Sequence, residues 1–157
     1  MGKINIRKVT QRDKPAIARL LEKIPEYTVE ERRQIRSMFE RKNYHHFIAE
    51  KTRNLVGAGT IFKLTPEIAY LTHMFVRPRQ LEENEIADKL RQALLQHAFE
   101  ELGAQSVHAN AKDKESVEKA RKVFEALGFS KKGKYVFSIT REKYFELKNA
   151  GGDAHAN

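Results

Sequence analysis

Three consecutive extended segments separated by short turns are the feature that most constrains the fold of this chain. The segments cover residues 47–50, 55–64 and 68–76, and the turns between them cover 52–54 and 65–67. Turns this short connect antiparallel neighbours, because a parallel connection needs about a dozen residues or more. The sequence therefore predicts an antiparallel meander in the middle of the chain.

Two glycines, Gly57 and Gly59, interrupt the middle segment of this meander. Glycine inside a strand is typical of a bulge or of a close approach by another part of the chain. A strand that is merely weak would show the same pattern. Neither glycine belongs to a phosphate-binding loop.

Segments with helical periodicity precede the meander. Apolar residues recur at helical spacing over 13–24, and Asp13 is a candidate N-cap for that helix. Thr28 and Glu31 have the spacing of a capping box, in which each side chain accepts a hydrogen bond from the other residue's backbone amide. This capping box predicts a second helix that runs through Phe39.

The remaining elements complete a mixed pattern. The strongest helical stripe covers 85–102 and another helix covers 113–127, while short strands cover 4–9, 106–111 and 135–140. This order predicts an α/β (α+β) fold with a mixed, mostly antiparallel central sheet flanked by helices.

The length of the chain is sufficient for one hydrophobic core, and the sequence contains no repeat and no second domain boundary. We therefore expect a single domain over residues 1–147. The last residues, 148–157, are small and polar, which predicts a disordered C-terminal tail.

The absence of cysteine limits the chemistry of the protein. Without cysteine there are no disulfides, no thiol nucleophiles and no cysteine-ligated zinc. His45 and His46 lack a third ligand at metal spacing, so we interpret them as the start of a strand and expect no metal. No apolar run approaches the roughly 18 residues of a membrane-spanning helix. The N-terminal residues lack the apolar core of a secretory signal, so we expect no membrane association and a cytoplasmic location.

The chain is strongly basic, with 30 Lys and Arg residues against 21 Asp and Glu residues and a formal net charge of +9. Such a charge attracts polyanions, which makes nucleic acid or a phosphorylated ligand a candidate partner. A solubilising surface is the simpler explanation, because the basic residues are dispersed along the chain.

Two local motifs carry a resemblance to a known family. Residues 69–78 read Ala-Tyr-Leu-Thr-His-Met-Phe-Val-Arg-Pro, and residues 124–129 read Phe-Glu-Ala-Leu-Gly-Phe. The first resembles the fourth strand, with its Val-x-Pro ending, of the GNAT superfamily of acyl-CoA-dependent N-acyltransferases, and the second resembles that family's C-terminal signature. The order of elements over residues 3–141 is also similar. The resemblance implies a GNAT-like sheet and acetyl-CoA as the acyl donor.

The resemblance also implies positions that bind the cofactor. In the family the fourth and fifth strands splay apart, acyl-CoA enters the gap, and backbone groups of strand four pair with the pantetheine. Carried over to this chain, Phe75 and Val76 would offer these backbone contacts. Phe124 stands where the family commonly has a tyrosine that reprotonates the CoA thiolate, a step that a phenyl ring cannot perform.

The segment after strand four would bind the pyrophosphate, because the first amides of a helix are unpaired and its dipole favours an anion. The family uses Gln/Arg-x-x-Gly-x-Gly/Ala there, whereas this chain has Glu85 at the first glycine position and Ala87 at the second. A well-capped helix, with Asn84 as N-cap, explains the acidic turn equally well. The candidate cofactor residues of this segment are Arg77, Leu81, Asn84, Glu85, Ile86 and Ala87.

Acyl transfer to an amine needs a base with a pKa near the working pH. His73, in the predicted fourth strand, meets that requirement, although a satisfied and partly buried histidine would look the same in the sequence. Tyr135 or Tyr70 could replace the missing proton donor, but a tyrosine on a strand is more often a packing residue.

Two functions follow from these observations. The first is an N-acetyltransferase that moves an acetyl group from acetyl-CoA directly to an amine acceptor, which the basic surface would associate with RNA or protein. The alternative is a catalytically inactive GNAT-like domain that binds nucleic acid or a protein partner. The altered loop favours the alternative, whereas the preserved Val-x-Pro ending favours the enzyme. The sequence leaves a homodimer open.

Overall fold

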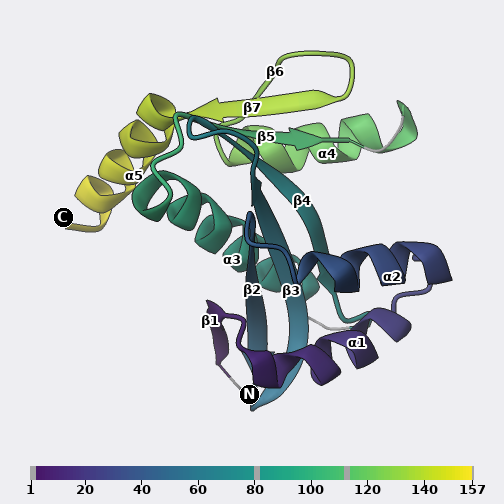
Figure 1. Cartoon of the computed structure of the whole chain (residues 1–157). Helices are drawn as coiled ribbons and strands as arrows, with labels where there is room; N and C mark the ends of the chain where they lie inside the picture. The colour runs from purple at the N-terminus through teal and green to yellow at the C-terminus, as the bar shows by residue number, and fades with distance from the viewer. Residues whose placement is uncertain (1–2, 80–81, 112–113, 157) are drawn as a thin grey trace. The chain divides into compact units, whose positions relative to one another are not determined.

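The computed structural model describes residues 3–79, 82–111 and 114–156, and the backbone alone for 114, 115 and 152–156. The chain divides into two compact units. The first unit comprises Met1–Phe62 and Leu71–Gln96, and the second comprises Lys63–Tyr70 and His97–Asn157. Figure 1 labels the α-helices and strands of both units.

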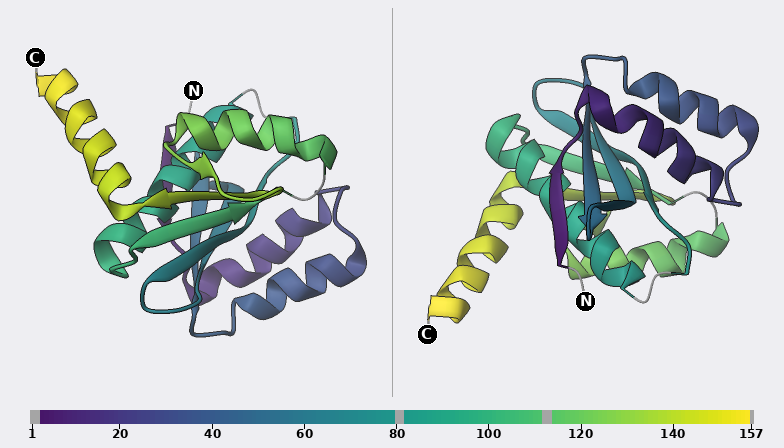
Figure 2. Two further views of the ribbon diagram at one scale, coloured as in Figure 1. Left: turned by 90° about the horizontal axis from the view of Figure 1, so that it is seen from above. Right: turned by 90° about the horizontal axis from the view of Figure 1, so that it is seen from below.

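The first unit is built on an antiparallel meander. Its strands β1, β2 and β3 pair antiparallel, with Ile6 opposite Ala49 and Ile48 opposite Ala58. Helices α1 and α2 lie on one face of these strands and α3 lies on the other (Figure 2). The elements are β1 Ile4–Lys8, η1 Gln11–Asp13, α1 Lys14–Glu22, α2 Val29–Met38, β2 Tyr44–Lys51, β3 Asn54–Lys63, β4 Ile68–Val76 and α3 Glu83–Gln96.

The second unit contains the other strands. Strand β5 pairs antiparallel with β7, which also pairs antiparallel with β6. The elements are η2 His97–Glu101, β5 Ser106–Asn110, α4 Lys114–Ala126, β6 Ser130–Lys131, β7 Val136–Thr140 and α5 Arg141–Ala156. Strand β4 belongs to both units, and the strand order is β1-β2-β3-β4-β5-β7-β6. This mixed, mostly antiparallel sheet with flanking helices confirms the predicted fold class.

The core of the first unit explains why α1 and α2 pack where they do. Apolar side chains at helical spacing on α1 meet strand residues that alternate toward the same face, such as Ile48 and Phe75. Burial of this set supplies the main favourable term of folding. The buried cluster consists of Ile17, Leu20, Leu21, Ile24, Ile35, Ile48, Ala58 and Phe75.

The two glycines of β3 allow α3 to approach the strand closely. A Cβ atom at Gly57 would lie 3.1 Å from Leu90 Cδ1 and 3.2 Å from the carbonyl oxygen of Phe75. A Cβ atom at Gly59 would lie 2.8 Å from Leu94 Cδ1. The close approach is therefore present, and so is a bulge: the register shifts between Ala49, opposite Gly57, and Glu50, opposite Leu55, which leaves Val56 of β3 as the extra residue.

Of the two helix N-caps that the sequence predicts, one is present and one is absent. The Thr28–Glu31 capping box is confirmed, with the Glu31 amide donating to Thr28 Oγ1 at 3.1 Å. Asp13 precedes α1 but makes no capping hydrogen bond there. Its carboxylate instead binds the guanidinium of Arg7 at 2.8 Å and the amide of Thr10 at 2.7 Å, because a buried carboxylate is satisfied best by a cation.

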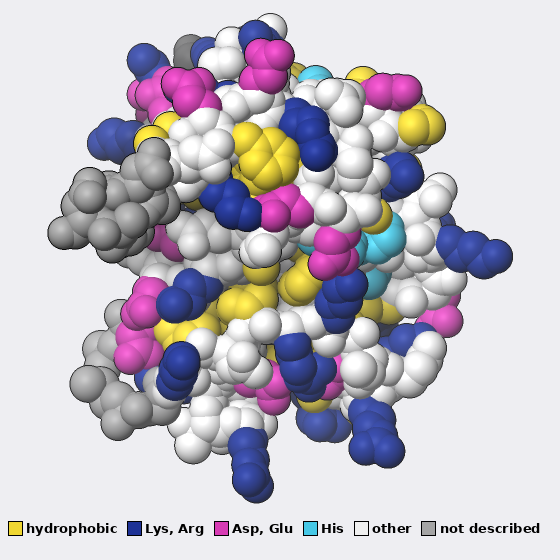
Figure 3. Space-filling model, turned by 90° about the vertical axis from the view of Figure 1, so that its left-hand side faces the viewer, with side chains coloured by type: hydrophobic (Ala, Val, Ile, Leu, Met, Phe, Trp, Pro, Cys, Tyr) yellow, Lys and Arg dark blue, Asp and Glu magenta, His cyan; other side chains and the backbone are white. Residues whose placement is uncertain are grey.

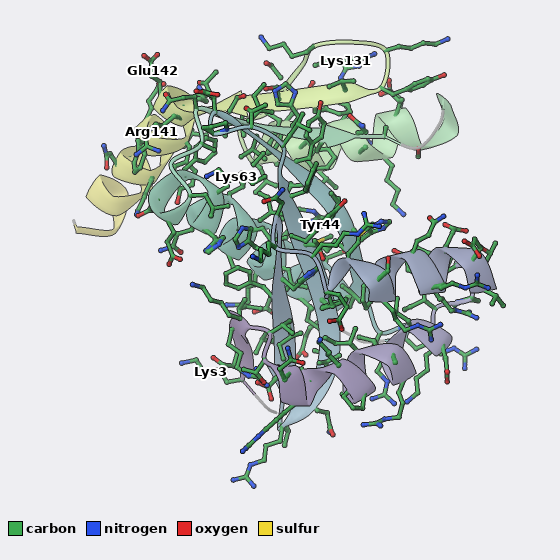
Figure 4. The ribbon with its side chains drawn as sticks, in the orientation of Figure 1. Lys3, Tyr44, Lys63, Lys131, Arg141 and Glu142 are labelled. Carbon is green, nitrogen blue, oxygen red and sulfur yellow. The ribbon has the colours of Figure 1, made fainter. Side chains whose placement is uncertain are left out.

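Helix α5 runs from Arg141 to Ala156 and so extends into the segment 148–157, for which the sequence predicts a disordered tail. Arg141, labelled in Figure 4 at the start of this helix, donates to the carbonyl oxygens of Phe99 and Ala104. One turn further on, the Tyr144 hydroxyl donates to a carboxylate oxygen of Glu100 at 2.5 Å. These contacts hold the first half of α5 against η2. The expectation of a single domain over 1–147 stays a prediction.

Among the described residues, no helix is both long and apolar enough to cross a membrane. Lys and Arg side chains are scattered over the face shown in Figure 3, between carboxylates and uncharged atoms. This distribution matches the dispersed basic residues of the sequence.

Candidate functional site

Strand β4 carries three of the candidate residues, His73, Phe75 and Val76, and Arg77 follows directly after it. Phe75 is buried among the side chains of α1 and α2, and Tyr27 packs edge-to-face against its ring at a centroid distance of 6.1 Å. Because side chains alternate along a strand, His73 and Arg77 project toward the same face as Phe75. Val76 projects toward the other face. The backbone of β4 is thus held from one side by α1 and α2.

His73 is half-buried on this face. Burial lowers its pKa below the usual value of 6.5, and the negative charge of Glu31 on α2 opposes that shift. The imidazole is therefore neutral at neutral pH, which is the form that can accept a proton. The capping box places the Glu31 side chain at the first turn of α2 and so determines the charge that faces His73.

The end of β4 is fixed by hydrogen bonding to β3. The amide of Arg77 donates to the carbonyl oxygen of Val56 at 2.7 Å, so this amide is not free to bind a ligand. Two residues later, Arg79 has a φ of 64°, which is a left-handed backbone conformation that is uncommon for a residue with a side chain. The chain thus turns sharply away from the sheet before α3. Leu81, a predicted cofactor residue, lies outside the described residues.

Helix α3 begins at Glu83, two residues earlier than the sequence predicted. Asn84 therefore lies inside the first turn and is not the N-cap. The amide of Ile86 donates to the carbonyl oxygen of Glu82 at 2.9 Å. The amides at the start of the helix that have no intrahelical acceptor are therefore those before Ile86. Asn84 and Glu85 are exposed, whereas Ile86 and Ala87 are buried against the sheet.

A lysine from the β2–β3 hairpin neutralises part of the acidic turn before α3. Lys51 Nζ forms an ion pair with a carboxylate oxygen of Glu82, and both side chains are only about a fifth exposed. Partial burial strengthens such a pair relative to one in bulk water. The pair leaves Glu83 and Glu85 as the exposed carboxylates at the start of α3.

Phe124 and Tyr135, the remaining candidates, belong to the second unit. The Phe124 ring packs against Phe129 at 5.1 Å and against Phe137 at 5.4 Å between centroids, so it is part of an aromatic cluster between α4 and β7. Tyr135 is half-buried immediately before β7, and its carbonyl oxygen accepts a hydrogen bond from the Ala111 amide at 2.7 Å. Tyr70 packs 5.2 Å from the ring of His108.

His45 and His46 do not belong to a metal centre within the described residues. The described parts of the chain contain no group of three His, Cys, Asp or Glu residues that could hold a metal ion. His46 has a structural role, as the start of β2 that the sequence predicted. It stacks on Phe39 at a centroid distance of 3.9 Å, and Nδ1 lies 2.8 Å from Thr60 Oγ1. Burial lowers its pKa to about 4, so it stays neutral.

One group of residues near the end of β4 was not predicted from the sequence. Arg77 lines a cavity of about 240 Å³ together with Arg19, Lys23 and Arg53. Their positions are 58 residues apart from first to last (77 − 19), and no sequence motif links them. The dispersed positive charge of the chain was the only signal that could have indicated such a cluster.

Comparisons with known proteins identify the family and the fold. The profile of the Acetyltransferase (GNAT) family matches residues 9–129, so the chain belongs to the GNAT family of acetyltransferases. The resemblance noted in the sequence is therefore confirmed. None of the curated proteins matches the chain.

Solved structures of GNAT proteins share the fold. A GNAT-family protein of Desulfovibrio desulfuricans has a TM-score of 0.74 at 17% identity, covering 88% of this chain and 99% of that one. The dodecameric spermidine N-acetyltransferase of Vibrio cholerae has a TM-score of 0.71 at 16% identity, covering 90% and 95%. The aminoglycoside 6'-N-acetyltransferase of Enterococcus faecium has a TM-score of 0.71 at 14% identity, covering 87% and 97%.

Proposed function

We propose that this protein transfers an acetyl group from acetyl-CoA directly to an amine. The observation that carries the proposal, given the membership of the GNAT family, is the position of His73 on β4. Burial lowers the pKa of this imidazole, so it can accept a proton at neutral pH. It lies two residues from Phe75, whose backbone the family resemblance assigns to the acyl donor.

The chemistry assigns one role to each group. An acceptor amine is protonated at neutral pH, and His73 takes one proton so that the nitrogen lone pair can attack the acetyl carbonyl carbon. A C–N bond forms, the C–S bond breaks, the attacking nitrogen gives its second proton to solvent, and the CoA sulfur leaves as a thiolate that takes up a proton. Tyr135 is the candidate donor of that proton, because Phe124 has no hydroxyl. No covalent enzyme intermediate is required, which suits a chain without cysteine.

The donor would be held by backbone groups of Phe75 and Val76 and by the first amides of α3. The acidic residues of that turn weaken an anion site, since a carboxylate about 5 Å from a phosphate costs roughly 3 kcal/mol at an effective dielectric of about 20. The ion pair between Lys51 and Glu82 removes part of this cost. Arg77 adds a positive charge at the end of β4.

We propose the acceptor as a class of amine rather than as one compound. The net charge of +9 favours an amine that is attached to an anionic molecule, such as RNA or an acidic protein. The structural neighbours that act on spermidine and on aminoglycosides make small polyamines a second group to test. We also expect a cytoplasmic location. The dodecameric neighbour supports a further expectation, that this chain associates with copies of itself.

Calorimetric titration with acetyl-CoA and with CoA tests the donor. We expect micromolar binding by the wild type and at least tenfold weaker binding by Val76→Pro, which removes a backbone amide from β4. The matched control is Val136→Pro at the first residue of β7, where circular dichroism reports whether proline itself unfolds a strand of this protein. No heat of binding at millimolar acetyl-CoA with folded wild type would contradict the proposal.

A further inference from the structure

A cavity of about 240 Å³ lies between α1, the β2–β3 turn and the end of β4. All of its lining residues belong to the first unit. Ala16, Arg19 and Leu20 of α1 and its C-cap residue Lys23 have helical spacing and form one stripe on the flank of that helix. The complete lining consists of Ala16, Arg19, Leu20, Lys23, Arg53, Asn54, Leu55 and Arg77.

The cavity carries four cations and no acidic lining residue. None of the four forms an ion pair with a carboxylate in the part of the chain that the structure describes. Elsewhere in the same unit, cations do find such partners: Arg7 binds Asp13 and Lys51 binds Glu82. The four cavity cations therefore repel one another, with solvent screening at Arg19, Lys23 and Arg53, which are exposed.

The local structure holds these charges together at a cost. Arg19 lies in the last turn of α1 and Lys23 is the C-cap residue four positions later, so two like charges are held close together. Arg53 has a φ of 66° in the β2–β3 turn, although asparagine or glycine suits this left-handed conformation better. The backbone of Arg77 is fixed by its hydrogen bond to Val56. A bound anion would offset these costs.

We propose that this cavity binds a phosphate group. Two or more guanidinium groups can donate paired hydrogen bonds to phosphate oxygens, which is the geometry for which arginine is suited. The Asn54 side chain offers a further polar contact, and Leu20 and Leu55 supply apolar walls. The volume is below that of a typical drug-sized pocket, so it suits one phosphate group with its immediate substituent. The proposal does not depend on acetyl transfer.

The first test measures binding of inorganic pyrophosphate by calorimetry. The variant Arg19→Gln/Arg53→Asn removes two of the cations, and asparagine is compatible with the positive φ at position 53. The matched control, Arg12→Gln/Lys42→Gln, removes the same charge from exposed residues that do not line the cavity. We expect the cavity variant to bind at least tenfold more weakly and the control to stay within about twofold of wild type. Absence of binding by wild type, or an equal loss in both variants, would overturn the proposal.

The second test identifies the source of the phosphate by comparing CoA with dephospho-CoA, which lacks the 3'-phosphate. If the cavity variant weakens CoA binding and leaves dephospho-CoA binding unchanged, the occupant is the 3'-phosphate of the donor. If the variant loses pyrophosphate but binds CoA as the wild type does, the occupant is another phosphorylated ligand. If pyrophosphate binding depends on the cavity while neither protein binds CoA, the phosphate site stands and the acetyltransferase proposal fails.

Discussion

Gly57→Ala should destabilise the protein, because the added Cβ atom has no room between β3, β4 and α3. That atom would lie 3.1 Å from Leu90 Cδ1, 3.2 Å from Ile86 Cγ2 and 3.2 Å from the carbonyl oxygen of Phe75. The two side chains are fully buried, and the oxygen belongs to the backbone of a central strand. None of these three neighbours can move away cheaply.

The size of the effect follows from two opposing terms. Overpacking of this kind costs about 1–3 kcal/mol. Replacing glycine lowers the entropy of the unfolded chain, which stabilises by about 0.4–1 kcal/mol. The difference between the two terms is about 0–2.6 kcal/mol, and a loss in the middle of that range, about 1.3 kcal/mol, lowers the melting temperature of a chain of this length by roughly 3–5 °C. The strain acts on the strand that we propose holds the donor, so acetyl-CoA affinity should fall as well.

Urea and thermal unfolding measure the stability change. Gly133→Ala is the matched control, because a Cβ atom there would only reach ordinary contact with Val136, at 3.7 Å. We expect that control to unfold within about 0.5 kcal/mol of wild type. A Gly57→Ala protein more stable than wild type would refute the close packing of α3 on β3.

Three further predictions concern single groups. The hydrogen bonds from Arg7 lower the pKa of Asp13 to about 2, so this carboxylate stabilises the fold above pH 4 by about 1–2 kcal/mol after discounting for the exposure of Arg7. The contribution is lost as the pH falls from about 4 to 2. Urea unfolding across that range should show the loss of stability, and Asp13→Asn should abolish this pH dependence. Thr28→Ala should cost about 1 kcal/mol in the same assay by removing the acceptor of the Glu31 amide, and unchanged stability would argue against the capping box. If His73 is the base, kcat/KM should fall on the acid side with a midpoint below 6.5, because burial lowers its pKa, and a midpoint above that value would exclude the role.

Local signals in the sequence were sufficient for much of the fold. The Thr28–Glu31 capping box depends on residues three apart, and the structure contains it with both hydrogen bonds. The meander was predictable because strand alternation and short turns are also local. The strand that carries His73 could be placed for the same reason.

Features that depend on distant residues could not be predicted. Small polar residues predict a disordered tail over 148–157, whereas α5 runs into this segment and Lys148 forms an ion pair with Glu100, 48 residues earlier. The basic cavity assembles Arg19, Arg53 and Arg77 from separate elements, so no spacing reveals it. The role of Gly57 depends on where α3 packs, which is a tertiary property.

A thiol-release assay with a panel of amines tests the central claim most directly. The chain contains no cysteine, so a thiol reagent detects only the CoA that acetyl transfer releases. The account predicts amine-dependent release of CoA by wild type. In His73→Gln, kcat should fall about 10²–10⁴-fold with unchanged acetyl-CoA affinity. The control His45→Gln, on β2, should keep wild-type activity. Wild-type rates in His73→Gln, or acetyl-CoA binding without release for any amine, would contradict it.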